Sequence, residues 1–116
     1  MSKPSSEEGA MTFRLKVPDA KLTEAVTLLA EKLDPRAIIL FGSRARGTHR
    51  PDSDYDLLVV SEQLRDYDEV YEPIAGRGIG CDVVPCTVEA WKEADQDAGG
   101  VLRAALDEGI LLYGQP

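Results

Sequence analysis

The feature that most constrains this chain of 116 residues is a run of five apolar residues, Ala37–Phe41, which ends abruptly at a glycine. A continuous apolar run with β-branched residues is typical of a strand that is covered on both faces, in the centre of a sheet. The segment that follows, Gly42–Pro51, is rich in Gly, Arg and Ser and is the strongest break in the pattern. The sequence therefore predicts a buried central strand that delivers a polar loop to one end of a sheet.

Helix and strand patterns alternate around this strand. Apolar residues recur at three- and four-residue spacing from Leu22 to Leu33, which predicts a helix capped by Asp19. The other expected strands are 13–17, 54–60, a core strand at 81–85, and 110–113; the other expected helices are a short acidic helix or loop at 66–76, one that begins near Val88 after a Thr87 cap, and 101–108. The predicted fold class is α/β (α+β), a single mixed sheet with helices packed on it.

Length and composition are those of one globular domain. The chain is 43% hydrophobic and 29% charged, which are ordinary values for a folded protein. Residues 1–12 are mostly polar, so we expect a flexible N-terminal tail followed by a single domain at 13–116. No apolar run approaches the roughly 20 residues that span a bilayer, and the N-terminus lacks a signal-peptide pattern. We therefore expect a soluble, cytoplasmic protein without a membrane partner.

The charge balance and the cysteines exclude several functions. Thirteen Lys and Arg against 21 Asp and Glu give a net charge of −8. Nucleic-acid backbones are bound through clustered positive charge, so we expect no direct nucleic-acid binding, and the acidic surface suits a basic partner. Cys81 and Cys86 would lie about 16 Å apart on opposite faces of a strand, too far for a disulfide. We expect free, buried thiols, and with one His49 no zinc site.

The loop after the central strand has the features of a phosphate-binding turn. Gly42 and Ser43 stand between a strand and residues that can begin a short helix, and such a turn offers backbone N–H groups and a hydroxyl to an anion. Gly42 has no Cβ, so a phosphate can approach its backbone closely. Arg44 and Arg46 add positive charge to an otherwise acidic chain. These four residues are the predicted nucleotide-binding set.

Three carboxylates are the candidate catalytic and metal-binding residues. Asp54 and Asp56 are two apart on a strand and share a face, and a site that tolerates such repulsion often holds a divalent cation. Asp82 lies in an apolar strand, where an unpaired buried charge would be costly, and it could join them if that strand is a neighbour. Taken singly, each feature also fits an ordinary turn, a solvated strand end or an edge-strand charge. Together they form the layout for in-line transfer at phosphorus with one or two Mg²⁺ ions.

The segment GSRARGTHRPDSDYDLLVV resembles the Gly-Ser…Asp-x-Asp signature of the DNA polymerase β-type nucleotidyltransferases, and it is most similar to their minimal nucleotidyltransferase (MNT) branch. The resemblance runs from about residue 20 to the closing segment 101–113. It implies transfer of AMP from ATP to a hydroxyl, with Mg²⁺ held by Asp54 and Asp56 and, at a more variable position, by Asp82. It also implies that Gly42 and Ser43 grip the β- and γ-phosphates, with Arg46 and Arg44 near the phosphates or a partner.

The resemblance further implies a protein partner. Stand-alone MNT proteins often pair with a helical HEPN-domain protein, an RNase toxin that the MNT member neutralises by attaching AMP to a tyrosine hydroxyl. We see no second domain that would bind an acceptor, which favours a separate protein acceptor. Two alternatives stay open: a non-catalytic nucleotide-binding antitoxin or interaction module, and a small-molecule nucleotidyltransferase of the aminoglycoside type, whose acceptor pocket would come from a homo-oligomer.

Overall fold

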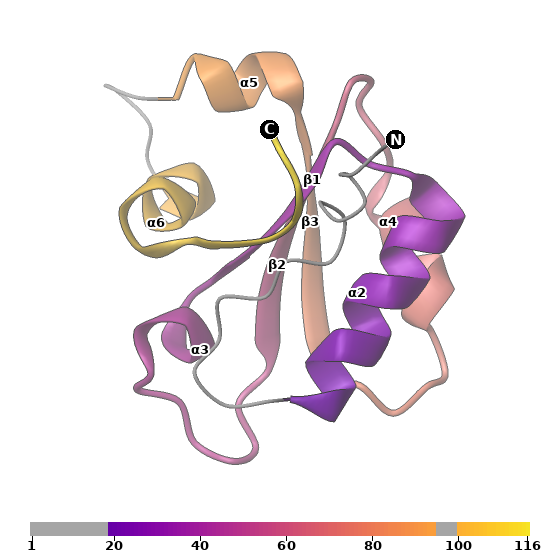
Figure 1. Ribbon diagram of the computed structural model, residues 1–116, viewed down its shortest axis with the longest axis vertical. Coiled ribbons are helices and arrows are strands. Elements are labelled where there is room, and N and C mark those ends of the chain that lie inside the picture. Colours follow the sequence, from indigo (N-terminus) through magenta and orange to yellow (C-terminus); the bar gives the residue numbers. More distant parts are fainter. Residues whose placement is uncertain (1–18, 95–99) are drawn as a thin grey trace, which may run out of the picture.

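The computed structural model describes residues 19–94 and 100–116 (Figure 1). Its elements follow in the order α2 (Ala20–Leu33), β1 (Ala37–Phe41), α3 (Ser43–Arg46), β2 (Tyr55–Ser61), α4 (Tyr67–Tyr71), the 3₁₀ helix η1 (Glu72–Ile74), β3 (Cys81–Thr87), α5 (Val88–Lys92), α6 (Gly100–Glu108) and β4 (Ile110–Gly114). The predicted tail at 1–12 and the predicted strand at 13–17 lie outside the described residues. Within the described part, no helix is long and apolar enough to cross a membrane.

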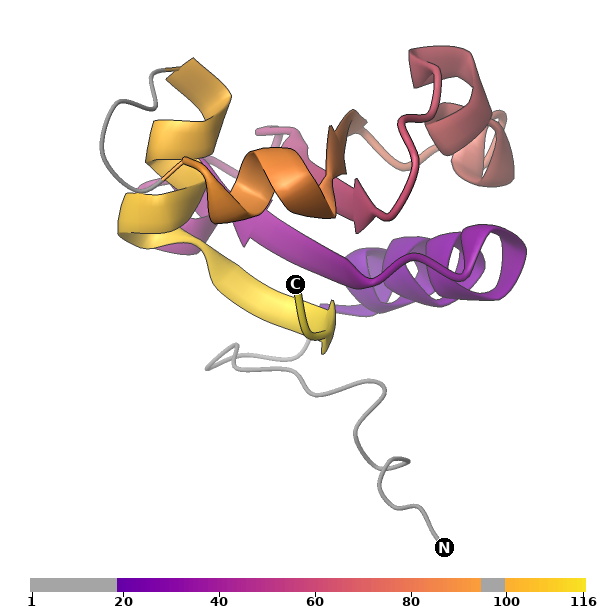
Figure 2. The same ribbon diagram turned by 90° about the horizontal axis from the view of Figure 1, so that it is seen from above.

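The four strands form one mixed sheet in the order β3-β2-β1-β4. β1 runs antiparallel to both β2 and β4, whereas β2 and β3 are parallel. All five residues of β1 are buried, as the apolar run predicted. Ile38 and Leu40 pack into a core with α2, while Ile39 and Phe41 pack into a second core with α5 and α6. Figure 2 shows both α5 and α6 well away from α2, and the two cores show that helices cover both faces of the central strand.

The sequence predicted the caps of two helices correctly. The Asp19 carboxylate accepts a hydrogen bond from the Leu22 N–H at 3.1 Å and so caps the first turn of α2. The Thr87 hydroxyl accepts one from the Ala90 N–H at 3.0 Å at the start of α5. The acidic segment predicted as a helix or loop at 66–76 forms α4 and η1.

The predicted strand at 81–85 forms as part of β3, but its expected place in the core of the sheet was wrong. β3 pairs with β2 alone among the described strands, so it is an edge strand, and Asp82 on it is exposed. Asp82 is therefore not the unpaired buried charge that the sequence suggested. Both cysteines are free, but Cys81 is only half-buried, while Cys86 is buried in the opposite core.

The strand directions bring the predicted site residues to one end of the sheet. The C-terminal end of β1 lies beside the N-terminal end of β2 because these strands are antiparallel. The N-terminal end of β3 joins them because β3 is parallel to β2. Gly42 follows β1, Asp54 immediately precedes β2, and Asp82 is the second residue of β3.

Candidate active site

Asp56 stands at the centre of the site because of the strand register. It is the direct partner of Phe41 on β1, one residue before Gly42, and of Asp82 on β3. Asp54 lies two residues earlier, at the exposed start of β2. The structure therefore places the Gly-Ser turn and the three predicted carboxylates at the same end of the sheet. The strand of Asp82 is a neighbour of the strand of Asp56, as the inclusion of Asp82 required.

Two glycines make room for two of these carboxylates. A Cβ atom on Gly42 would lie 2.2 Å from Asp56 Oδ2, and one on Gly80 would lie 2.6 Å from Asp54 Oδ1. The sequence suggested that Gly42 lets a phosphate approach; in the structure the carboxylate of Asp56 already fills the space beside it. Gly80 was missed in the sequence, where it stands in Gly-Arg-Gly-Ile-Gly just before β3.

The carboxylates repel one another and are only partly neutralised by a nearby cation. Burial raises the pKa of Asp56, the charges of Asp82 and Asp54 raise it further, and the Arg46 cation only partly opposes them. In the described part of the chain, no ion pair joins any of the three to a Lys, Arg or His. A group of hard oxygen donors in this electrostatic state is suited to a cation such as Mg²⁺.

The three carboxylate side chains do not form a metal-binding cluster in this structure. Among the described residues, no three His, Cys, Asp or Glu side chains are close enough together to hold a metal ion. Asp54 and Asp82 are exposed and make no hydrogen bond within the described chain, so their side chains can turn towards Asp56. The residues present therefore fit a divalent cation by their chemistry and their placement on adjacent strands.

The turn after β1 begins a helix of four residues, as the sequence suggested. Gly42 has φ 81° and ψ −161°, a backbone region that is open essentially to glycine alone. Its carbonyl accepts hydrogen bonds from the N–H groups of Ala45 and Arg46, which close the first turn of α3. The Ser43 hydroxyl is half-buried and makes no hydrogen bond to any described residue. It is therefore a donor that an incoming anion can use.

Arg44 is occupied within the protein. Its guanidinium donates hydrogen bonds to the carbonyls of Ser53, at 2.8 and 3.1 Å, and Pro51, at 3.1 Å. It also lies 4.1 Å from the centroid of the Tyr55 ring, a cation–π contact. These contacts fasten the loop before β2 onto α3. His49, on the same loop, is exposed.

Arg46 is held by a residue that the motif did not include. Its Nη1 donates to Glu108 Oε2 at 2.9 Å, and the same oxygen accepts a hydrogen bond from the Gly42 N–H at 2.8 Å. Glu108 is the last residue of α6, in the closing segment that contributed to the family resemblance, but no spacing or motif in the sequence singles it out.

Comparison with known proteins shows the family of this chain. A family model described as the nucleotidyltransferase domain matches residues 22–111, which is most of the chain. The chain belongs to the nucleotidyltransferase domain family. A search of curated proteins finds no match.

Solved structures share the fold of this nucleotidyltransferase domain. One is a toxin–antitoxin structure with AMP-PNP, at 24% identity and a TM-score of 0.58, covering 80% of this chain and 73% of that chain. Another is a rebuilt and re-refined structure of a tri-AMPylated Shewanella oneidensis HEPN toxin in complex with MNT antitoxin, at 20% identity and a TM-score of 0.53, covering 83% and 71%. These similarities confirm the predicted fold class, a single mixed sheet with helices.

A buried tyrosine of the nucleotidyltransferase domain gives a first testable prediction. The Tyr55 hydroxyl donates to the Asp19 carboxylate at 2.8 Å, and burial followed by this interaction raises the pKa of Tyr55 to about 12. In a titration followed at 295 nm, we expect one of the four tyrosines to ionise late. Because the folded state keeps this proton longer, stability should fall as pH rises from about 10 towards 12. The Tyr55→Phe variant should lose the late transition; a late transition that survives in it would contradict the assignment.

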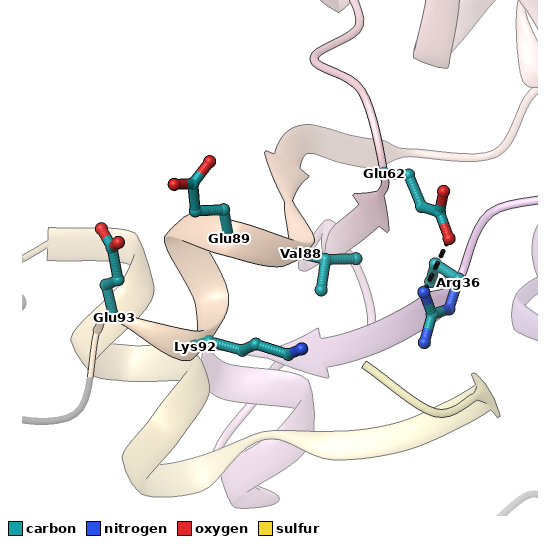
Figure 3. A pocket seen from close by; sticks show the side chains of 6 residues that line it. All are labelled: Arg36, Glu62, Val88, Glu89, Lys92 and Glu93. Carbon is teal, nitrogen blue, oxygen red and sulfur yellow. Dashed lines mark hydrogen bonds and ion pairs between the residues drawn. The ribbon is translucent and has the colours of Figure 1, made fainter.

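A hollow of about 400 Å³ lies at the other end of the sheet of the nucleotidyltransferase domain. Figure 3 shows that Lys92 and Arg36 point into the same region and that Arg36 pairs with Glu62. Arg36 precedes β1 and Glu62 follows β2, so this hollow is separated from the carboxylates by the length of the strands. None of the predicted site residues lines it, so its Arg–Glu pair is a distant control for variants of the candidate site.

Proposed function

We propose that this nucleotidyltransferase domain transfers AMP from ATP to a hydroxyl of a protein partner, with Mg²⁺ bound by Asp54, Asp56 and Asp82. The observation that supports it most is the register that sets Asp56 beside Asp82 while its carboxylate lies against Gly42 of the Gly-Ser turn. A site for acidic metal ligands and a site for phosphates therefore share one end of the sheet. The family match over residues 22–111 supports the same class of reaction.

The triphosphate would be held by the turn and α3. The Ser43 hydroxyl, which makes no hydrogen bond to any described residue, would donate a hydrogen bond to a phosphate on this turn. Arg46 would contribute positive charge to the β- and γ-phosphates, since only Nη1 of its guanidinium is engaged with Glu108. A role for Arg44 in nucleotide binding stays a prediction, because its Nε and Nη2 donate to Ser53 and Pro51 and its Nη1 lies 3.8 Å from the Asp19 carboxylate.

The reaction would be an in-line displacement at the α-phosphorus. The acceptor oxygen forms a bond to that phosphorus, the bond from the α-phosphorus to the bridging oxygen breaks, and pyrophosphate leaves with the bonding electrons. Asp82 would accept the proton of the acceptor hydroxyl, because it is the exposed carboxylate on the edge strand. Mg²⁺, when bound, would neutralise the charge that develops on the phosphate oxygens. Asp54 and Asp56 would hold the Mg²⁺ ion beside the Gly-Ser turn.

We infer that the acceptor is a tyrosine of a HEPN-type toxin, which would make this protein an antitoxin. Structures with the same fold include a toxin–antitoxin with AMP-PNP and a tri-AMPylated HEPN toxin in complex with MNT antitoxin. The net charge of −8 also suits a basic protein partner.

A label-transfer assay tests the proposed function. Purified protein, Mg²⁺ and ATP labelled at the α-phosphate are incubated with lysate of the source cell, and labelled products are separated and identified by mass spectrometry. We expect a labelled protein whose modified residue is a tyrosine. In the Asp54→Asn variant the label should fall by about a hundredfold or more, because a metal ligand is lost.

The matched control is Asp52→Asn, which removes an exposed carboxylate from the same loop. This variant should label the partner as well as the wild type does. Equal labelling by Asp54→Asn would contradict the metal site. Nucleotide binding by the wild type without transfer to any protein, RNA or small molecule would contradict the enzymatic proposal and favour the non-catalytic module.

A further inference from the structure

Glu108 connects two parts of the candidate site that are far apart in the sequence. Its Oε2 accepts one hydrogen bond from the Gly42 N–H and another from Arg46 Nη1, at 2.8 and 2.9 Å. The contact to Gly42 spans 66 positions of the chain and joins the end of α6 to the end of β1. The Glu108 side chain is only 20% exposed, so solvent screens this contact less than it screens a typical surface pair.

The two hydrogen bonds fix the geometry of the phosphate-binding residues. Gly42 sets the start of α3 and Arg46 is its last residue, so one carboxylate oxygen holds both ends of this short helix. The other donors of Arg46 have no hydrogen-bond partner among the described residues. An arginine side chain loses considerable conformational entropy when a bound ligand orders it. Because Glu108 already holds one nitrogen of Arg46, less entropy is lost when a ligand binds Arg46.

We propose that Glu108 is a positioning residue for nucleotide binding, which holds Arg46 and the Gly42 peptide in place so that the remaining donors of Arg46 meet the phosphates of ATP. The proposal rests on the proposed function, since it assigns the turn and Arg46 to the triphosphate. Charge alone predicts the opposite effect of Glu108 on nucleotide affinity. Glu108 adds negative charge to an already acidic site, so by charge alone its removal should tighten the binding of an anionic nucleotide.

The test measures the affinity for Mg²⁺ and AMP-PNP by isothermal titration calorimetry on the full chain. Glu108→Ala removes both hydrogen bonds, and we expect the Kd to rise about tenfold, which is the effect of losing one charge-assisted hydrogen bond. Glu108→Gln keeps an acceptor oxygen in nearly the same shape, so its Kd should rise less. In an Arg46→Gln background, Glu108→Gln should have little further effect, because Arg46 is gone and the amide oxygen of the glutamine can still accept from the Gly42 N–H.

The matched control is Glu62→Gln. It breaks another Arg–Glu pair, Arg36–Glu62 at 2.8 Å, beyond the opposite ends of β1 and β2, and should leave the Kd unchanged. A lower or unchanged Kd in both Glu108 variants would overturn the positioning role, and so would a fall in Tm without a change in Kd. Wild-type protein that binds no AMP-PNP would instead overturn the proposed function, and this assignment with it.

Discussion

The Asp56→Asn variant should lose AMP transfer and gain stability. Asp56 lies beside Asp82 in the parallel register and next to the Gly-Ser turn, so its carboxylate is the central ligand of the proposed metal site. Loss of such a ligand should lower kcat by about a thousandfold, because several kcal/mol of charge stabilisation depend on it. Without metal, the same carboxylate is held among like charges, and a neutral amide of the same shape should raise the Tm by a few degrees.

The pH dependence of stability gives this prediction a second readout. Because the pKa of Asp56 is raised above its ordinary value, the folded state binds a proton that the unfolded state has already released. In the pH range just above that ordinary value, about 4, this group therefore makes the wild type less stable as pH rises. The difference in free energy of unfolding between Asp56→Asn and the wild type should grow over this range and then level off.

The control again is Asp52→Asn, which should change neither transfer nor the Tm. Unfolding is followed by circular dichroism in the presence of a chelator, so that bound metal does not offset the repulsion. An Asp56→Asn variant with full transfer activity would contradict the metal site. A variant that is less stable than the wild type at pH 7 would contradict the electrostatic account of the carboxylates.

The parts of the fold that depend on local pattern were predictable from the sequence. The apolar run Ala37–Phe41 identified the central strand, and periodic apolar residues identified α2. Strand order is not encoded in such patterns, so the apolar stretch around Asp82 was interpreted as a core strand although it lies at the edge. The exposure of Asp82 at this edge is compatible with its proposed role as the acceptor of a hydroxyl proton.

The candidate site was predictable only where the contributing residues are close in sequence. The sequence placed both Arg44 and Arg46 in the nucleotide-binding set, yet residues two apart on a helix face different directions. One therefore fastens the loop before β2 and the other meets α6. Glu108 and Gly80 contribute through contacts between segments that no spacing rule connects, and only the folded chain shows that each serves a predicted site residue.

Gly42→Ala should disrupt the site by placing a methyl group where the Asp56 carboxylate lies. The new Cβ would stand 2.2 Å from Asp56 Oδ2, on a backbone with φ 81°. We expect the free energy of unfolding to fall by about 2–4 kcal/mol and the affinity for Mg²⁺ and AMP-PNP to be lost. Urea unfolding and calorimetry measure the two effects.

Gly47→Ala is the matched control, because Gly47 also has a positive φ, 79°, but a Cβ there would have nothing within 4 Å. It should cost only about 1 kcal/mol, the penalty for a left-handed residue, and should bind AMP-PNP normally. The backbone region of Gly42 is also less favourable than that of Gly47, so Gly42→Ala has two costs: backbone strain and the clash with the Asp56 carboxylate. A double-mutant cycle with Asp56→Ala separates these two costs. If the carboxylate is responsible, Gly42→Ala should cost clearly less in the Asp56→Ala background than in the wild type. Equal costs in both backgrounds would mean that Asp56 does not lie against Gly42, and the close association of turn and carboxylate that supports the proposed function would be lost.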